Sequence, residues 1–220
     1  DCGFLIRHDH QYHWENHDYS CFDDFLTELS SRKRKNIRKE RRTLQEKGIT
    51  TQALTGEDVT TGHWDAFYRF YRDTYDRKWG HPYLTREFFD RLSASMADRT
   101  VLILSYFDGR PIAGAINFFD ANALYGRNWG CVEDHKFLHF ETCYYAAMDF
   151  AIEHGLKRVE AGTGGHHKLQ RGYVPHQTYS AHWMENENFR DAVARFLEKE
   201  RDLEAKQAVA LTQYAPFRKD

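Results

Sequence analysis

The order of the expected secondary-structure elements constrains the fold of this chain more than any single motif does. Three apolar, strand-like runs follow one another, at residues 100–107, 111–119 and 123–130. The first two are separated by Asp108-Gly109, a dipeptide typical of a tight hairpin, so an antiparallel meander is predicted. Residues 140–154 then show helical periodicity, Gly155 predicts the end of that helix, and residues 156–159 indicate a buried strand.

The rest of the chain adds further helices and strands on both sides of this meander. Strands are predicted at residues 4–14, 49–54 and 178–184, and helices at 22–46 (one or two), 63–75, 85–96 and 188–210. Thr85 is a suitable N-cap for the helix that follows it. Because no βαβ unit is repeated, a doubly wound nucleotide-binding fold is excluded. The order indicates an α+β protein with a mixed, mostly antiparallel sheet flanked by helices.

The composition bounds the size of the protein and the class of its partners. With 220 residues, 41% of them hydrophobic and 15% aromatic, the chain can bury the core of one globular domain or two small lobes. The formal net charge is −2, so any contact with nucleic acid or phosphate must be local. No apolar run approaches the ~20 residues that cross a bilayer. The cysteines lack C-x-x-C spacing, which favours buried thiols in a reducing cytoplasm: Cys2, Cys21, Cys131 and Cys143.

A short polar segment directly after the predicted strand at 156–159 is the strongest candidate for a functional site. Residues 160–179 read EAGTGGHHKLQRGYVPHQTY and place charged and histidine side chains around Gly162, Gly164 and Gly165. Ligands of open sheets commonly bind beyond strand ends, where backbone N–H groups are free, and glycine lets the backbone approach them closely. An ordinary loop between two strands has a similar composition, so both interpretations stay open.

The segment SRKRKNIRKERR at residues 31–42 is the most basic part of the chain. Its cations, opposed by the single acid Glu40, are Arg32, Lys33, Arg34, Lys35, Arg38, Lys39, Arg41 and Arg42. On a helix these charges spread around most of the surface, which is typical of a solvated helix. Alternatively, the segment binds phosphates of tRNA, of a pyrophosphate-bearing cofactor or of a lipid-linked precursor.

Histidines gather at three places, and none of them predicts a metal site. In RHDHQYH only His8 and His10 share one face of a strand, so a metal there would need a third ligand from elsewhere. The adjacent His166 and His167 are better candidates for proton transfer, because histidine titrates near neutral pH. Helix capping is the simpler role for the third group: Glu133, Asp134, His135, His139 and Glu141. Phosphate-loop, nucleophile-elbow and H-E-x-x-H motifs are absent from the sequence.

Four segments of the chain combine into a recognisable pattern. They are SRKRKNIRKERR followed by Lys47-Gly48-Ile49, the aromatic stretch at 71–89, the tetrapeptide RNWG at 127–130, and EAGTGGHHKLQRGYVP from Glu160. Together they resemble the FemAB-like family of N-acyltransferases, which is related to the FemABX peptidoglycan aminoacyltransferases. The resemblance spans nearly the whole chain and implies the GNAT-like acyltransferase fold. It also implies that residues 1–220 form a single domain, the carboxyl-terminal part of a longer two-lobe protein.

The resemblance further implies roles for individual residues. Lys168 matches the lysine of the family's F-K-x-x-F-G motif, which contacts substrate and stabilises developing negative charge. Gly172 and Tyr173 stand where that motif has Phe-Gly. The acceptor amine must lose a proton, and Glu160 and His166 are the candidate bases. The predicted lining of the substrate groove combines anion-binding and aromatic side chains: Arg77, Trp79, Arg127, Trp129, Arg171 and Tyr173.

These features predict an N-acyltransferase that moves an acyl or aminoacyl group to the amine of a small molecule or peptide, such as a cell-wall precursor. Lys168 and backbone N–H groups of residues 162–165 would hold the tetrahedral oxyanion. No bound cofactor is expected, and the co-substrate is acyl-CoA or aminoacyl-tRNA. A tRNA would bind through Arg32, Lys33, Arg34, Lys35, Arg38 and Lys39. Acetyl-CoA is not favoured, because the Q/R-x-x-G-x-G/A loop is missing between Gly130 and Phe140.

Two other interpretations of the chain stay open. In the first, it is a non-catalytic recognition module for a peptidoglycan precursor or RNA, which uses the basic helix and the aromatic groove. Replacing Lys168 separates this module from the enzyme, because only the enzyme would lose turnover while keeping its ligand. In the second, the chain is a scaffold that forms half of a larger enzyme and has no activity alone.

Overall fold

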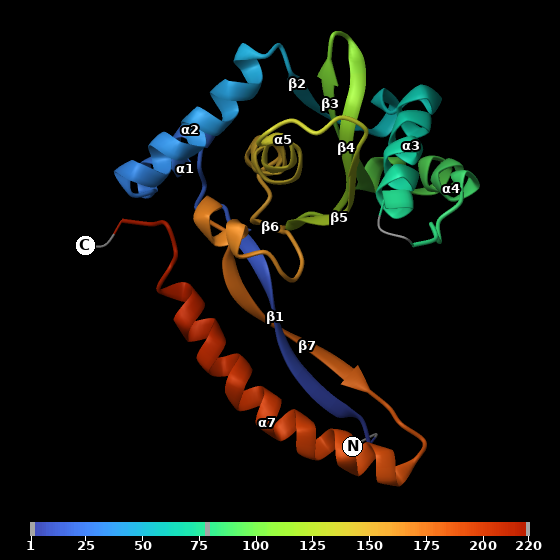
Figure 1. The fold of residues 1–220 in the computed structure, drawn as a ribbon, viewed down its shortest axis with the longest axis vertical. Coiled ribbons are helices and arrows are strands. Elements are labelled where there is room, and N and C mark those ends of the chain that lie inside the picture. Colours follow the sequence, from blue (N-terminus) through green and yellow to red (C-terminus); the bar gives the residue numbers. More distant parts are fainter. Residues whose placement is uncertain (1–2, 78–79, 219–220) are drawn as a thin grey trace.

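One mixed sheet forms the centre of the molecule (Figure 1). The computed structural model describes residues 3–77 and 80–218, and over these residues seven strands pair in the order β2-β3-β4-β5-β6-β1-β7. The strands are β1 Leu5–Glu15, β2 Thr50–Thr55, β3 Thr100–Phe107, β4 Arg110–Phe119, β5 Ala123–Cys131, β6 Arg158–Glu160 and β7 Val174–His182. Strands β5 and β6 run parallel, and the other neighbours run antiparallel. The predicted α+β class with a mixed, mostly antiparallel sheet is confirmed.

The helices lie where the sequence periodicity predicts them. The α-helices are α1 Phe22–Glu28, α2 Ser31–Glu46, α3 Thr61–Arg77, α4 Arg86–Met96, α5 Leu138–Phe140, α6 Ala146–Glu153 and α7 Glu187–Thr212, and short 3-10 helices are η1 Gly56–Asp58, η2 Ala97–Arg99 and η4 His166–Arg171. The predicted cap of α4 is confirmed, because the Thr85 hydroxyl accepts a hydrogen bond from the backbone N–H of Phe88 at 3.3 Å.

The structure decides one open prediction and differs from another. The helical stretch at 22–46, predicted as one helix or two, is two helices, because Leu29 is extended and forms an isolated bridge with Phe217. The helix predicted at 140–154 is not continuous. A π-helical turn, η3 (Glu141–Tyr145), separates α5 from α6. Such turns commonly mark functional sites, because the widened backbone redirects the side chains that follow.

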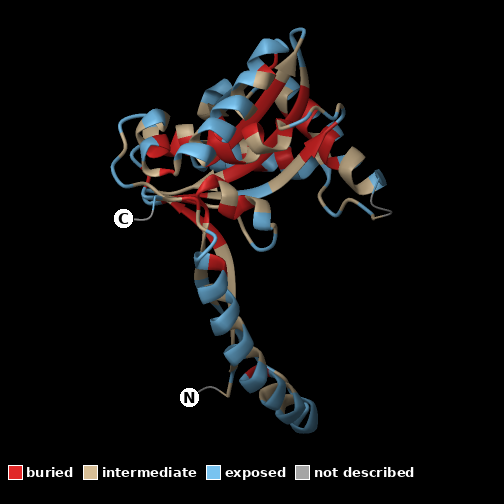
Figure 2. Ribbon diagram, turned by 60° about the vertical axis from the view of Figure 1, so that its left-hand side comes forward, coloured by how far each residue is buried: buried red, intermediate tan, exposed pale blue. Residues whose placement is uncertain are grey.

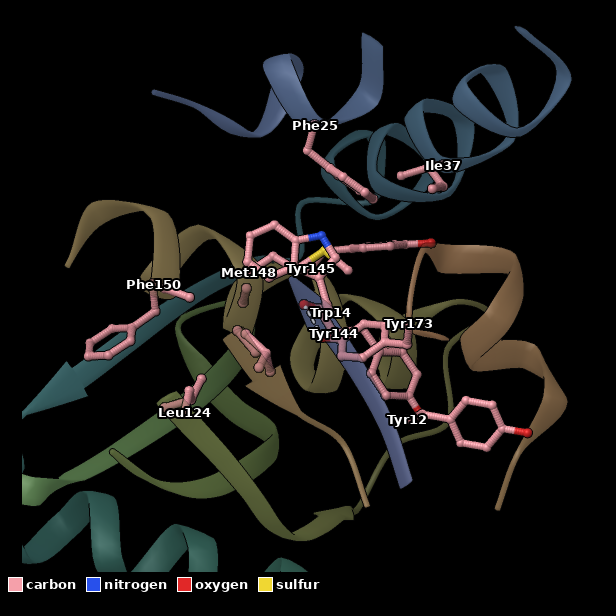
Figure 3. Close-up of a cluster of buried hydrophobic side chains, with 14 of the residues drawn as sticks. Tyr12, Trp14, Phe25, Ile37, Leu124, Tyr144, Tyr145, Met148, Phe150 and Tyr173 are labelled. Carbon is pink, nitrogen blue, oxygen red and sulfur yellow. Dashed lines mark hydrogen bonds between the residues drawn. The ribbon is translucent and has the colours of Figure 1, made fainter. Parts of the chain in front are cut away.

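Helices cover both faces of the central strands. In β3, Val101 and Ile103 point into one hydrophobic cluster while Leu102 and Leu104 point into another, which explains the unbroken apolar run of this strand. The first cluster packs the sheet against α1, α2 and α6, and part of it is drawn in Figure 3. The second cluster packs the sheet against α3 and α4.

Strands β1 and β7 continue beyond the rest of the sheet and form, with α7, a projecting arm (Figures 1 and 2). The two strands pair from Leu5↔His182 to His13↔Val174, whereas β6 pairs with only the last three residues of β1. Arg7 of β1 fastens α7 through two bonds to the Glu200 carboxylate, each 2.8 Å long. Much of α7 is exposed, and none of the described helices is both long and apolar enough to span a membrane.

Candidate active site

A cavity opens where β5 and β6 stop pairing. These parallel strands are in register only from Ala123↔Arg158 to Tyr125↔Glu160. Beyond this point β5 continues to Cys131, while β6 ends and the chain enters the glycine-rich segment at residues 161–165. The cavity between them has a volume of about 450 Å³. Its lining includes Asn117, Arg127, Asn128, Trp129, His139, Cys143, Tyr144, Thr163 and Lys168.

Lys168 lines this cavity and bonds to the glycine-rich segment. Only 6% of the residue is exposed. Its Nζ donates to the carbonyl oxygens of Ala161, Gly162 and Thr163 at 2.6, 3.2 and 3.1 Å. Burial lowers the pKa of Lys168 to about 8, so the ammonium still predominates at neutral pH. The cation therefore gathers the carbonyl groups of the segment around itself.

The backbone N–H groups of the same segment are free. Within residues 3–77 and 80–218, those of Thr163, Gly164 and Gly165 donate to no protein acceptor. The start of the segment is fixed to β1, since the N–H of Ala161 donates to the carbonyl of Tyr12 at 2.9 Å. Free N–H groups on an anchored backbone next to a cation can bind an oxygen atom that carries negative charge.

His139 supplies a neutral imidazole to the cavity. Its ring packs edge-on against Trp129 and Tyr144, with centroids 5.1 and 5.3 Å away. Burial lowers the pKa of His139 to about 4, with further lowering by His167 and Arg171. In the described part of the chain, neither ring nitrogen of His139 has a hydrogen-bond partner. The ring can therefore accept a proton from a bound ligand at neutral pH.

His167 forms the wall behind this imidazole. Its Nε2 lies 2.9 Å from the Tyr144 hydroxyl, and its ring centroid lies 5.7 Å from that of His139. The ring of His167 can lie here only because residue 165 is glycine. The φ of Gly165 is +88°, and a Cβ at this residue would lie 2.7 Å from Cε1 of His167. Burial lowers the pKa of His167, and Arg171 and Lys168 lower it further.

The two bases predicted from the sequence lie away from the cavity lining. Glu160 is the last residue of β6, and its carboxylate accepts from Nε of Arg158 at 2.7 Å on the side of β6 opposite to the buried Val159. His166 is exposed at the start of η4. The structure instead brings His139 to the cavity, and the ring of His167 packs against that of His139. The sequence suggested a capping role for His139 because it precedes a helix, and no local pattern revealed its contact with Trp129.

The residues predicted to line the groove separate into two groups. Arg127 and Trp129 line the cavity together with Lys168, and Arg127 donates to the Tyr83 hydroxyl at 3.3 Å. Arg77 lies outside it and donates to the carbonyl of Cys131 at 2.8 Å. Trp79 lies outside the described residues.

Arg171 and Tyr173 support the cavity from behind. The Arg171 guanidinium donates to both carboxylate oxygens of Glu40 at 2.8 Å and lies 3.3 Å from the centroid of the Phe140 ring. Tyr173 is fully buried, and its hydroxyl donates to the Tyr144 carbonyl at 3.2 Å. Both residues therefore contact the segments that carry the lining side chains.

Helix α2 presents most of its positive charge to the surface. Ile37 and Leu44 are buried, and Arg41 pairs with Glu141 and Asp149 at 2.9 and 2.6 Å. Arg38 pairs with the exposed Asp23. The remaining basic side chains predicted to bind tRNA are exposed or half-buried: Arg32, Lys33, Arg34, Lys35 and Lys39. Their binding to tRNA stays a prediction.

Acid should destabilise the protein before its carboxylates titrate. Burial lowers the pKa of both His13 and His139 to about 4, whereas an unfolded histidine has a pKa of about 6.5. Between these values the unfolded state binds more protons, so the free energy of unfolding should fall as the pH falls, by up to about 1.4 kcal/mol per pH unit for each histidine. Urea unfolding at several pH values measures this slope. His139→Gln should make it shallower and the exposed His182→Gln should not; equal slopes in both variants would contradict the assignment.

Comparison with known protein families gives one match over nearly the whole chain. A family model named FemAB-like, described as peptidoglycan biosynthesis/recognition, matches residues 1–219. No curated protein sequence matches the chain.

Solved structures share the fold at low sequence identity. L-PGS from Bacillus licheniformis is 10% identical with a TM-score of 0.62, and the match covers 89% of this chain and 67% of that one. The carboxyl-terminal domain of a putative lysylphosphatidylglycerol synthetase from Agrobacterium fabrum is 12% identical with a TM-score of 0.62, covering 90% and 67%. FemX is 12% identical with a TM-score of 0.60, covering 88% and 66%. The fold expected from the sequence resemblance is thus found.

Proposed function

Because this chain belongs to the FemAB-like family, whose described role is peptidoglycan biosynthesis or recognition, we propose that it transfers an acyl or aminoacyl group to an amine. One observation supports this chemistry above the others. The neutral imidazole of His139, the buried cation of Lys168 and Thr163, whose backbone N–H is free, line a single cavity of about 450 Å³. Acyl transfer needs a proton acceptor for the amine and donors for the oxyanion, and the cavity offers both.

In the proposed reaction, the acceptor amine attacks the carbonyl carbon of the donor. A C–N bond forms, and the C–S bond of an acyl-CoA or the C–O bond of an aminoacyl-tRNA breaks. His139 takes the proton that the amine loses and returns it to the leaving group. The N–H groups of residues 163–165 and the charge of Lys168 stabilise the oxyanion, and the bonds of Lys168 to three carbonyl groups keep those N–H groups in place.

We propose a peptide amine of a cell-wall precursor as the acceptor class. The family description supports this choice, since it names peptidoglycan. Arg127 can pair with a carboxylate of such a peptide, and the adjacent Trp129 offers an apolar surface. The donor is an acyl-CoA or an aminoacyl-tRNA, and the exposed basic side chains of α2 would bind the phosphates of the latter. We place this activity in the cytoplasm, as the free thiols of Cys21, Cys131 and Cys143 suggest.

A recognition module without catalysis is the second candidate function. The hydrogen bonds of Lys168 favour this function. Its ammonium group donates to three backbone carbonyl groups, so in this function the role of Lys168 is structural. In this alternative the cavity binds the same precursor, and no bond is made or broken.

Lys168→Ala tests the two functions against each other. The protein is incubated with acyl-CoAs or aminoacyl-tRNAs and a muropeptide precursor, and binding is followed by thermal shift. We expect turnover to fall about 100- to 1,000-fold while precursor binding remains. Lys168→Arg keeps the charge and serves as a second variant if alanine unfolds the segment, and the exposed Lys157→Ala is the control. Loss of binding in Lys168→Ala, with no turnover in either protein, would favour the module.

A further inference from the structure

A cluster of histidine and carboxylate side chains lies where the arm joins the sheet. His13 and Glu15 alternate with the buried Tyr12 and Trp14 and so lie on the other face of β1, where they meet His176 of β7. The ligand atoms that these three side chains offer lie within 4.8 Å of one another. Nε2 of His176 is 3.3 Å from a carboxylate oxygen of Glu15, and its ring stacks on that of His13 with centroids 4.7 Å apart.

The buried ring of His13 lacks one hydrogen-bond partner. Only 8% of the residue is exposed, and its Nε2 is buried without a hydrogen-bond partner in the part of the chain that the structure describes. The carboxylate of Glu160 lies 3.7 Å away, too far for a hydrogen bond. Leaving a buried polar atom in this state destabilises the folded protein. The neutral imidazole ring is the form of histidine that binds metal ions.

We propose that His13, Glu15 and His176 bind a zinc ion. Imidazole nitrogen and carboxylate oxygen are ligands that zinc prefers, at about 2.0–2.2 Å. Tetrahedral bonds of this length separate ligand atoms by about 3.4 Å, so the atoms that lie furthest apart must approach by up to about 1.4 Å, and the His176 ring must turn out of its stack on His13. Glu15 and His176 can make this movement, because 38% of each side chain is exposed.

The charges around the cluster favour a cation. Glu15 and Glu160 bring two carboxylates to the histidine pair, and Arg158, which is bonded to Glu160, offsets one of them. A bound ion would join β1 to β7 at the base of the arm. It would also lie beside Glu160, the last residue before the segment that lines the cavity. The proposal does not rest on the transferase activity, because none of its ligands lines that cavity.

A second group of possible ligands on the arm is less suited to a metal. Asp9, His10 and Glu204 also lie close together, but Nδ1 of His10 already bonds to the Glu204 carboxylate at 3.0 Å. No polar atom of this group is buried without a partner among the described residues. His10→Ala therefore serves as a control for zinc binding elsewhere on the arm.

Calorimetric titration of the chelator-treated chain with zinc chloride tests the proposal. We expect one ion to bind and His176→Ala to weaken its affinity at least about 100-fold, since even the loss of groups behind metal ligands costs 10- to 100-fold. The exposed His182→Ala on the same strand and His10→Ala should bind zinc as the unchanged protein does. Cobalt in place of zinc should give visible absorption that His176→Ala removes.

Glu15→Gln provides a second variant that alters a ligand without removing a ring from the stacked pair. It too should weaken zinc binding. No saturable binding by the unchanged chain, or binding that persists at full affinity in both His176→Ala and Glu15→Gln, would overturn the proposal.

Discussion

Replacing His139 with glutamine should lower kcat/KM for acyl transfer by about 100- to 10,000-fold, the usual contribution of a positioned general base. Glutamine keeps a polar side chain of similar size in contact with Trp129 and Tyr144 but cannot accept the amine proton. Binding of the acceptor, measured by calorimetry, should change little. The unchanged enzyme should also lose activity on acidification with an apparent pKa near 4, the value to which burial lowers the pKa of this imidazole.

A second histidine in the same part of the chain provides the control. His135 is half-buried, bonds to Glu133 at 3.2 Å and does not line the cavity. His135→Gln should therefore retain nearly full activity. If both variants lose activity equally, or if His139→Gln keeps its turnover, His139 is not the base.

Replacing Arg171 with alanine should lower the free energy of unfolding by about 3–5 kcal/mol, the usual effect of removing one partner of a buried ion pair. The side chains of Arg171 and Glu40 are only 7% and 14% exposed, so alanine would leave a carboxylate with little water around it. The Tyr145 hydroxyl also donates to Glu40 and would be its remaining partner. Urea unfolding measures the loss.

An exposed arginine of similar bonding provides the comparison. Arg91 pairs with Glu87 on α4, and their side chains are 78% and 68% exposed. Arg91→Ala should cost no more than about 0.5 kcal/mol, because water and salt screen such pairs. The double variant Arg171→Met with Glu40→Leu should recover much of the stability, since it leaves no unpaired charge. Equal losses in Arg171→Ala and Arg91→Ala would show that burial does not set the strength of the first pair.

The helices, caps and turns that depend on residues close together in the sequence were predictable. The hairpin at Asp108-Gly109, the Thr85 cap and the helix at 188–210 each follow from residues close together in the sequence. The pairing of β1 with β7 was not, because its partners are separated by most of the chain and periodicity says nothing about which strands meet. The π-helical turn was also missed, because its sequence shows the same apolar spacing as an ordinary helix.

Only the part of the candidate site that lies in one continuous segment of the sequence was predictable. The glycine-rich segment and Lys168 are contiguous, so composition alone drew attention to them. Glu160 directly follows the buried Val159, and strand alternation puts its side chain on the opposite face, which the strand pattern could have indicated. His139 could not be recognised, because its neutral state depends on burial beneath side chains from η4 and β5.

The position of β1 in the sheet determines when this strand can pair during synthesis of the chain. Strand β1 precedes the other six described strands in the chain, yet it lies between β6 and β7, and its partners are residues 158–160 and 174–182. Until those residues emerge from the ribosome, Tyr12 and Trp14 have no strand beside them and stay available for non-native contacts. Pairing over such sequence distances is slow, because the entropy of closing a long loop is lost before any contact compensates for it. Completion of the sheet therefore waits for residues 158–182, and β1 cannot pair until nearly all the other described strands have been made.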